Sequence, residues 1–265
     1  MERGVCLFSV VPVRAEPRHQ AEQVSQLLFG ETYQCLPSQD LDWLSIRCDW
    51  DGYEGFIPLV QHTPLTENDY QNLQTVTWHT AYRLVSRVED LESGITFPVL
   101  RGSTLYAQDG EIFAIGERRF ILHEESLTHR PTDPLERMID FAFTYLNAPY
   151  QWGGRSPFGI DCSGFVQVVF KSAGIRLPRD TWQQMAMGSP VDNAGEACPG
   201  DLVFFTGKDS QVSHVGLIYD EQKVIHASGF VKVGMLSDSG LWDPLLRQTT
   251  HRLHSIRRVT RPVFQ

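Results

Sequence analysis

The chain has 265 residues, of which 42% are hydrophobic and 21% are charged, proportions typical of a soluble folded protein. It holds 23 basic and 32 acidic residues, a formal net charge of −9, and the acidic residues are scattered along the sequence. Because a phosphate-binding surface needs a basic patch, this charge balance argues against a nucleic-acid partner. No apolar run is long enough to span a bilayer, so we expect no membrane partner either.

The first residues and the cysteines indicate in which cellular compartment the protein is expected. The start, MERGVCLFSVVPVRAE, lacks the basic region, apolar core and cleavage site of a secretory signal, so we expect a cytoplasmic protein if Met1 is the true start. The cysteines form no CxxC and no zinc-finger spacing with histidine, which predicts reduced thiols and neither a metal nor a cofactor. The five cysteines are Cys6, Cys35, Cys48, Cys162 and Cys198.

The pattern of the first half of the chain predicts β structure. Residues 1–62 alternate short apolar runs with turn residues, and this pattern predicts a small all-β barrel. The polar segment HTPLTENDYQN that follows is expected to be a linker. Residues 63–130 then show a similar pattern and predict a second small barrel. Their Asp109-Gly110 pair, set between two alternating runs, is a hairpin signal.

The pattern then becomes helical. Asp133 is placed to cap a helix that starts at Pro134, with apolar residues at helical spacing behind it. A loop rich in Gly and Pro leads to a second apolar helix, which opens at Cys162 and is closed by Gly174. Three strands are expected at 201–206, 214–220 and 223–229. Helices followed by strands predict an α+β domain over residues 131–265. We expect a solvated edge at the basic tail around Arg252, Arg257, Arg258 and Arg261.

Cys162 is the candidate nucleophile. It lies in the first turn of the second predicted helix, directly after Asp161, where free backbone N–H groups and the helix dipole favour a thiolate. The alternative on composition alone is a buried structural thiol. Against it, neighbouring glycines keep the surroundings open to a substrate backbone. These glycines are Gly153, Gly154, Gly159 and Gly164.

Two histidines are candidates for the base and its orienting partner. His214 begins a predicted strand and is expected to stand at a strand edge, while His226 lies on the next strand of a probable hairpin. Both are similarly distant from the turn, which places one imidazole within reach of the other on the same face. Each histidine taken singly fits a structural role. Together with Cys162, they have the pattern of a Cys–His–polar triad.

A series of short motifs runs through the second half of the chain. They are Tyr150-Gln151-Trp152-Gly153-Gly154, Asp161-Cys162-Ser163-Gly164-Phe165-Val166, Arg179-Asp180-Thr181 with Gln183 and Gln184, Pro199-Gly200-Asp201-Leu202-Val203-Phe204-Phe205, His214-Val215-Gly216-Leu217 with Tyr219, and Ile225-His226-Ala227. In this order they closely resemble the motifs of NlpC-type cell-wall cysteine peptidases, over roughly 135–262. The resemblance implies a papain-like α+β fold and hydrolysis of the γ-D-glutamyl bond to the diamino acid of peptidoglycan peptides. It also implies that Cys162, His214 and His226 are the catalytic residues.

The whole chain resembles one branch of this family, the γ-D-glutamyl-L-diamino acid endopeptidases, also called dipeptidyl-peptidase VI. In that branch two bacterial SH3-like domains precede the peptidase, and the resemblance assigns residues 1–62 and 63–130 to them. It implies that the first SH3-like domain narrows the cleft, that the substrate needs a free N-terminal L-Ala, and that Glu22 and Tyr53 form the wall. The matching residues are Val13-Arg14-Ala15-Glu16-Pro17, Ala21-Glu22-Gln23-Val24-Ser25-Gln26 and Asp51-Gly52-Tyr53-Glu54-Gly55-Phe56.

The expected reaction is attack by the Cys162 thiolate on the γ-D-glutamyl carbonyl, followed by hydrolysis of the thioester. His214 is expected to hold the proton and deliver it to the leaving amine, and His226 to orient the His214 ring. The backbone N–H of Cys162 and the hydroxyl of Tyr150 are the candidates for stabilising the oxyanion. For Tyr150 the alternative is an aromatic ring packed beside Trp152.

Substrate selection is expected to depend on charge. A free L-Ala presents an ammonium group, for which Asp161 and Glu22 are the candidate carboxylates. The candidate neutral partners are Ser163, Tyr53 and Thr181. Asp161 fits equally well as a helix N-cap. Arg179 is a candidate for the α-carboxylate of D-Glu, with an ion pair to Asp180 as the alternative.

The expected partner is a short murein peptide, L-Ala-γ-D-Glu-diamino acid, which a monomeric enzyme would cleave during peptidoglycan recycling. Two other functions stay open on the same residues. One is an N-acetylmuramoyl-L-alanine amidase or an acyltransferase, because one fold hosts several chemistries. The other is a non-catalytic protein that binds wall peptides.

Overall fold

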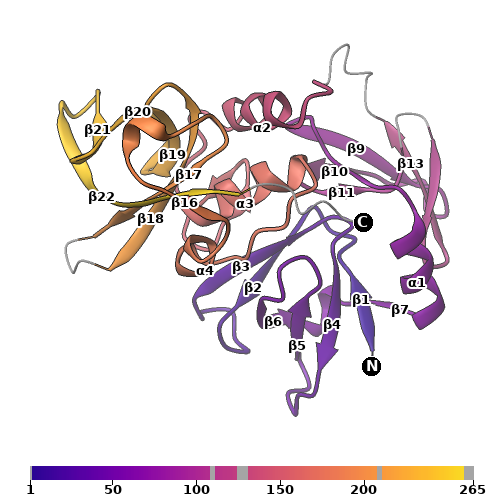
Figure 1. Ribbon diagram of the computed structural model, residues 1–265. Helices are drawn as coiled ribbons and strands as arrows, with labels where there is room; N and C mark the ends of the chain where they lie inside the picture. The colour runs from indigo at the N-terminus through magenta and orange to yellow at the C-terminus, as the bar shows by residue number, and fades with distance from the viewer. Residues whose placement is uncertain (1, 108–110, 124–130, 208–210, 260–265) are drawn as a thin grey trace. The chain divides into compact units, whose positions relative to one another are not determined.

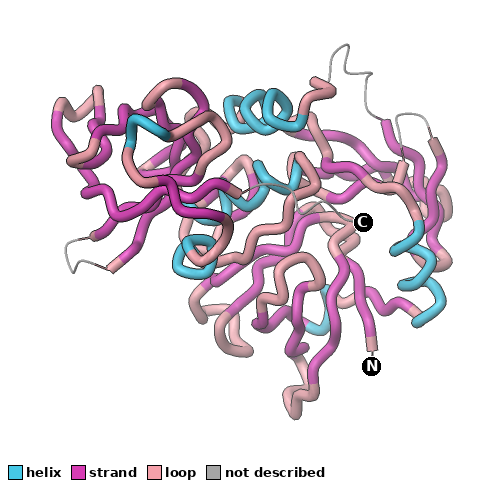
Figure 2. Tube along the Cα trace, in the orientation of Figure 1, coloured by secondary structure: helices cyan, strands magenta, loops and turns pink. Residues whose placement is uncertain are grey.

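The computed structural model describes residues 2–107, 111–123, 131–207 and 211–259. It divides into two compact units. The first unit is Met1–Arg130 with Trp152–Pro157, and the second is Pro131–Gln151 with Phe158–Gln265. Strands outnumber helices in both units (Figures 1 and 2). Within the described residues, no helix combines the length and the apolar character that a membrane crossing requires.

The first unit opens with a seven-stranded antiparallel sheet, in the order β3-β2-β6-β5-β4-β1-β7. Its strands are β1 (Arg3–Val5), β2 (Val10–Arg14), β3 (Gln23–Leu28), β4 (Thr32–Leu36), β5 (Trp43–Cys48), β6 (Glu54–Pro58) and β7 (Thr63–Leu65), with the 3-10 helix η1 (Leu59–Gln61) before β7. Alternate residues such as Val11, Val13, Ile46 and Ile57 point into one core, which is what the period-2 pattern predicts. The all-β prediction for this block is therefore confirmed.

The prediction that the polar segment HTPLTENDYQN is a linker is wrong. Its first residues form β7, which pairs with β1, and the rest forms the helix α1 (Glu67–Thr75). Thr66 caps α1 by accepting a hydrogen bond from the Asp69 N–H at 3.1 Å, and Leu73 is buried in a core shared with later strands. The cap and one apolar anchor were enough to order a segment whose polarity alone suggested a loop.

The remaining elements of the first unit are α1 and a set of short strands. The strands are β8 (His79–Thr80), β9 (Val85–Asp90), β10 (Thr96–Leu100), β11 (Thr104–Leu105), β12 (Ile112–Ile115), β13 (Arg118–His123) and β14 (Arg155–Ser156). They include a four-stranded sheet in the order β10-β9-β13-β12 and a β11-β8 pair. The predicted hairpin turn at Asp109-Gly110 lies outside the described residues. Among the described residues, β12 and β13 form a hairpin, and Gly116 between them has φ +61°.

The two β blocks of the first unit share a core. Phe29, which follows β3, packs against Phe97 and Phe120 with ring centroids 5.7 and 6.0 Å apart. Gly30 has φ +79°, and a Cβ atom there would lie 2.1 Å from the Thr104 carbonyl oxygen. The glycine therefore lets the two blocks approach closely. The division into domains 1–62, 63–130 and 131–265 stays a prediction.

The second unit is a sheet with helices packed against it. Its elements are α2 (Pro134–Phe143), β15 (Gly159–Ile160), α3 (Cys162–Ser172), α4 (Thr181–Met185), β16 (Ser189–Val191), η2 (Ala194–Glu196), β17 (Leu202–Thr206), β18 (Val212–Asp220), β19 (Lys223–Ser228), β20 (Phe230–Ser237), β21 (Gly240–Asp243) and β22 (Gln248–Arg258). The sheet order is β16-β22-β17-β18-β19-β20-β21, and β21 also pairs with β22, so the sheet closes on itself. α3 contacts α2, β18 and β19, and all of its residues are buried.

The predicted helix starts are confirmed. Asp133 caps α2, accepting from the Glu136 N–H at 2.9 Å, and Asp161 caps α3 in the same way through the Gly164 N–H at 2.7 Å. The three predicted strands are present as β17, β18 and β19. The predicted edge position of the basic tail is wrong, because β22 is paired on both sides, whereas Arg252 is exposed as expected. Arg258 forms an ion pair with the buried carboxylate of Asp201 at 2.8 Å. Arg261 lies outside the described residues.

Candidate active site

Cys162 is the first residue of α3 and is buried, with 5% of its surface exposed. Its Sγ lies 4.0 Å from the Ser213 carbonyl oxygen on β18. The Thr181 side chain, at the start of α4, also hydrogen-bonds the thiol. The candidate nucleophile is thus held where the first turn of α3 meets α4 and the start of β18.

The expectation of a resting thiolate is not met. Burial, and after it the carboxylate of Asp161, raises the pKa of the Cys162 thiol to about 11. Hydrogen bonds from the Val215 backbone and Thr181 and the charge of Arg179 act in the opposite direction and do not offset the burial. The helix N-terminus alone therefore leaves a protonated thiol, which needs a base at the moment of attack.

His214 and His226, the candidates for the base and its partner, form a hydrogen-bonded pair. His214 lies on β18 and His226 on β19, and Nε2 of His214 is 2.9 Å from Nδ1 of His226. The predicted hydrogen bond between the imidazoles is present, but the predicted strand-edge position is wrong, since only 6% of His214 and 1% of His226 are exposed. Gly216 makes room for the pair, because a Cβ there would lie 2.5 Å from the Val224 side chain and 3.1 Å from His226 Cβ.

The surroundings keep both imidazoles neutral. Burial lowers the pKa of His214, and His226, His251 and Lys232 lower it further. Burial, with His251 and Lys232, lowers the pKa of His226 to about 3. Lys232 lies opposite His226 in the β19–β20 register, and its Nζ is 2.6 Å from Oδ2 of Asp243. The resting site therefore combines a neutral thiol with a neutral base.

His251 completes a cluster of three imidazoles, which the motifs did not reveal. It lies on β22, with its ring stacked on His214 at a centroid distance of 4.4 Å and edge-on to His226 at 6.1 Å. Its Nδ1 is 2.8 Å from the Thr250 hydroxyl. Only the closure of the sheet through β22 brings this residue to the site, and no local pattern in the sequence carries that information.

Asp161, Ser163 and Arg179 form one buried polar network. Arg179 donates from Nη1 to Asp161 Oδ1 at 3.0 Å and from Nη2 to Oδ2 at 2.5 Å. It also donates to the Ser163 hydroxyl at 2.8 Å. Neither alternative for Arg179 included this bidentate pair with Asp161, and the role of Arg179 toward the α-carboxylate of D-Glu stays a prediction. The N-cap role of Asp161 is confirmed, and its role in binding a substrate stays a prediction.

The other predicted site residues lie in different places. Tyr150 is half-buried in the second unit, where burial and the nearby Cys162 and Asp161 raise the pKa of its hydroxyl. Glu22 and Tyr53 belong to the first unit. There the Glu22 carboxylate accepts a hydrogen bond from Trp152 Nε1 at 2.5 Å, which ties it to the Trp152–Pro157 segment of that unit. The roles of Glu22 and Tyr53 stay predictions.

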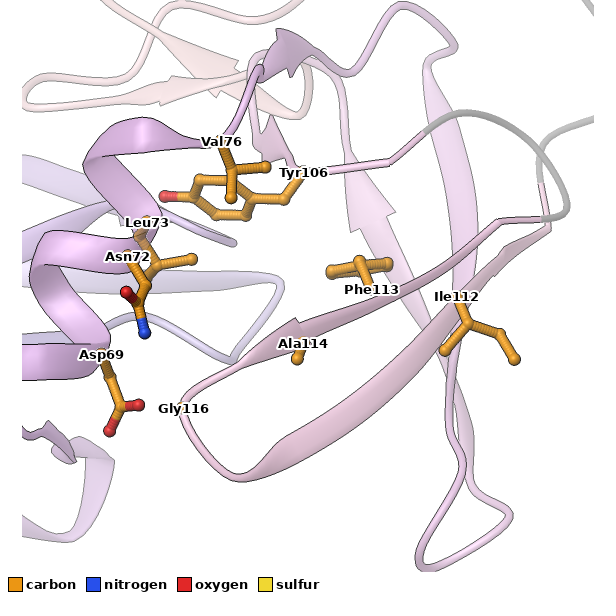
Figure 3. A pocket seen from close by; sticks show the side chains of 9 residues that line it. All are labelled: Asp69, Asn72, Leu73, Val76, Tyr106, Ile112, Phe113, Ala114 and Gly116. Carbon is orange, nitrogen blue, oxygen red and sulfur yellow. The ribbon is translucent and has the colours of Figure 1, made fainter.

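The first unit also has a cavity of about 330 Å³ beside α1 (Figure 3). Two of the polar side chains that line it have partners in the fold. Asp69 accepts from the Thr66 hydroxyl at 2.6 Å, and Tyr106 donates to the Gly30 carbonyl at 2.9 Å. The aromatic ring of Phe113 lines another part of the wall. We assign no ligand to this cavity.

Taken together, a thiol at a helix start, a hydrogen-bonded imidazole pair and a helix-on-sheet framework define a cysteine hydrolase. The NlpC/P60 family model matches residues 147–250, and the model of the bacterial dipeptidyl-peptidase SH3 domain matches residues 13–61. The chain therefore carries an NlpC/P60 domain behind an SH3-like domain and a β-barrel, and it is a cysteine peptidase.

Named relatives agree with this assignment. The chain is 28% identical to dipeptidyl-peptidase 6 of Lysinibacillus sphaericus, over 92% of this chain and 94% of the relative. It is 29% identical to γ-D-glutamyl-L-lysine dipeptidyl-peptidase of Bacillus subtilis, over 77% and 71% of the two chains. Among solved structures, an NlpC/P60 family protein from Bacillus cereus matches with a TM-score of 0.78 at 19% identity, over 97% of this chain and 99% of that chain. This last likeness concerns the fold.

Proposed function

We propose that the protein hydrolyses the γ-D-glutamyl–diamino acid bond of murein peptides that have a free N-terminal L-Ala, releasing L-Ala-D-Glu. The observation that carries the proposal is the hydrogen-bonded His214–His226 pair, together with a thiol at the start of α3 whose Sγ lies 4.0 Å from the carbonyl oxygen of Ser213, the residue before His214. The relatives named γ-D-glutamyl-L-lysine dipeptidyl-peptidase support the substrate class.

The geometry suggests the order of proton transfers. His226 engages Nε2 of His214, which leaves Nδ1 of His214 to take the proton of the Cys162 thiol. Sulfur then bonds to the γ-carbonyl carbon, and His214 returns the proton to the departing amine of the diamino acid. Water, deprotonated by His214, hydrolyses the thioester and regenerates the thiol. His226 holds the ring of His214 in the required tautomer throughout.

The oxyanion of the tetrahedral intermediate needs donors. The backbone N–H of Cys162 belongs to the first turn of α3, where N–H groups have no partner inside the helix. The Tyr150 hydroxyl is the second donor, and its raised pKa keeps it protonated at neutral pH. A papain-like arrangement of nucleophile, base and oxyanion donors is the finer fold that we propose for this unit.

Carboxylates of the enzyme would recognise the free N-terminal ammonium group of the substrate. Asp161 already binds Arg179 through both oxygens and caps α3, so it offers a rigid, oriented charge rather than a free one. Glu22 is the more exposed candidate, and Tyr53 and Thr181 are the neutral partners. We further propose that residues 63–130 are a second SH3-like domain, that the enzyme is a monomer, and that it works in the cytoplasm on free turnover peptides.

The test uses defined peptides and mass spectrometry of the products. L-Ala-γ-D-Glu-diamino acid should yield L-Ala-D-Glu, and its N-acetylated form should resist cleavage, because a blocked amine leaves the recognising carboxylates unpaired. Release of free peptide from an N-acetylmuramoyl-peptide would instead favour an amidase, and a product lengthened by a second amine would favour an acyltransferase. Equal rates on free and blocked peptides would remove the free-amine requirement.

A catalytic variant separates the enzyme from a binding protein. Cys162→Ala should lower product release by at least ~10⁴-fold, as expected when a nucleophile is lost, and leave the fold intact. Cys198→Ala, which removes an exposed thiol, should keep full activity. Binding of the peptide without turnover by the unmodified chain would support a wall-peptide-binding protein instead.

A further inference from the structure

Three side chains of metal-binding type meet in the first unit, and none of them is a residue of the proposed peptidase mechanism. Glu2 directly precedes β1, Cys35 lies on β4, and His62 stands between η1 and β7. The backbone brings them together, because β1 pairs with β4 on one side and with β7 on the other. The Cys35 N–H also donates to the Glu2 carbonyl at 2.9 Å. The cluster is thus a product of strand pairing between distant parts of the sequence.

The ligand atoms lie at distances that suit one small cation. A carboxylate oxygen of Glu2, Sγ of Cys35 and a ring nitrogen of His62 all fall within 4.8 Å of one another. Nε2 of His62 is 3.5 Å from Oε1 of Glu2. Nitrogen and oxygen ligands of one tetrahedral Zn²⁺ lie about 3.4 Å apart, given bond lengths near 2.1 Å. Glu2 is exposed, so its side chain can move the remaining distance toward the thiol.

His62 is oriented for this role. Its Nδ1 is 3.0 Å from the hydroxyl of Tyr33, a residue with no exposed surface. Only 9% of the His62 side chain is exposed, and its Nε2 is buried without a hydrogen-bond partner among the described residues. Metal-binding histidines commonly have this arrangement, with one nitrogen fixed by an outer hydrogen bond and the other directed to the ion. The Tyr33–His62 contact therefore prepares Nε2 as a ligand.

We propose that Glu2, Cys35 and His62 bind one Zn²⁺ ion, with water at the fourth position. One thiolate, one imidazole and one carboxylate form a mixed donor set that suits zinc better than magnesium or calcium. Glu2 and Cys35 also line an open hollow of about 590 Å³, which gives an ion access from solvent. The bound ion would link the residue before β1 to strand β4 and to the residue before β7. This site is independent of the peptide substrate proposed above.

Cobalt binding tests the site directly. The host is the full chain carrying Cys162→Ala, so that the catalytic thiol and its imidazoles cannot produce a thiolate signal. Titration with Co²⁺ should give a thiolate-to-cobalt charge-transfer band that saturates at one equivalent, and Zn²⁺ should displace it. Absence of the band, or saturation at several equivalents, would overturn the proposal.

Substitutions test which residues produce the thiolate-to-cobalt charge-transfer band. Cys35→Ser should abolish it, and Cys198→Ser, at an exposed thiol outside the cluster, should leave it unchanged. Tyr33→Phe removes the outer hydrogen bond of His62, together with a contact of the Tyr33 hydroxyl to the Thr63 backbone, and it should weaken Co²⁺ binding by about 10–100-fold. Glu2→Gln alters an exposed side chain that the fold does not need, and it should also weaken binding by at least tenfold. A band that survives Cys35→Ser, or Co²⁺ affinities unaffected by Glu2→Gln and Tyr33→Phe, would refute the assignment.

Discussion

The rings of His214 and His251 are stacked, with centroids 4.4 Å apart and planes inclined by 21°. His251 thereby covers one face of the proposed base, while His226 meets its edge with centroids 5.1 Å apart. Lys232, whose Nζ lies 2.6 Å from Oδ2 of Asp243, adds a positive charge that also lowers the pKa of His214. A charge on His214 is thus opposed by burial and by His226, His251 and Lys232, which keeps the ring available as a proton acceptor.

We expect His251→Phe to move the acid limb of the kcat/KM profile to higher pH. The substitution keeps a stacked ring but removes a basic group that lowers the pKa of His214. With that influence gone, His214 becomes protonated at a higher pH and stops acting as a base sooner as the pH falls. The matched control is His254→Phe on the same strand, an exposed residue whose replacement should leave the profile unchanged. An unmoved limb in His251→Phe would show that His251 only packs.

Alkylation of Cys162 should report a protonated resting thiol. With the pKa of the thiol raised to about 11, the rate of inactivation by iodoacetamide should increase about tenfold per pH unit from pH 7 toward the pKa. The measurement is best made in a Cys198→Ala background, which removes the exposed thiol. A rate that is already constant near neutral pH would instead indicate a thiolate–imidazolium pair.

The Asp161–Arg179 pair should be important for stability. Arg179→Met leaves the Asp161 carboxylate buried without its counter-charge, so the free energy of unfolding should fall by about 3–5 kcal/mol in denaturant titrations. Asp180→Asn is the control, because asparagine also caps helices and the substitution leaves both members of the Asp161–Arg179 pair in place. A larger loss from Asp180→Asn than from Arg179→Met would contradict the pairing.

A second buried ion pair allows the same comparison in the first unit. Arg155 donates from Nη1 and Nη2 to the two oxygens of Glu31 at 2.8 and 2.9 Å, and both side chains are buried. Glu31→Gln should lower the free energy of unfolding of this unit by about 3–5 kcal/mol. Glu54→Gln breaks the exposed pair with Arg47 and should cost at most about 1 kcal/mol. Equal losses would show that burial does not distinguish the two pairs.

The proposed role of Glu22 predicts a selective kinetic effect. Glu22→Gln should raise KM for peptides with a free L-Ala by about tenfold, the cost of one charged hydrogen bond at a partly exposed site, with kcat less affected. Glu16→Gln, in the same loop region and paired with Arg18 on the surface, is the control. A KM for Glu22→Gln that equals the unmodified value would remove Glu22 from substrate recognition.

Local signals predicted the parts of the molecule that local chemistry determines. Asp161 caps α3 as its sequence position indicates, and the spacing of His214 and His226 about a turn was enough to place their rings in contact. The pairing of Arg179 with Asp161 was not foreseen, because it depends on how α4 folds back on α3. The raised pKa of Cys162 was missed for a related reason. The sequence shows that Cys162 lies at a helix start but not how deeply it is buried. Burial raises the pKa of the thiol more than the helix dipole lowers it.

The closed sheet also constrains when the protein can fold. β22 pairs with β16, β17 and β21, and it follows all of them in the sequence. During synthesis, β17 and β21 each keep one edge with unpaired backbone N–H and C=O groups until β22 has been made. Such unpaired edges are the surfaces through which strands aggregate. The same delay withholds His251 from the site, so a nascent chain acquires its complete imidazole cluster only when the barrel closes.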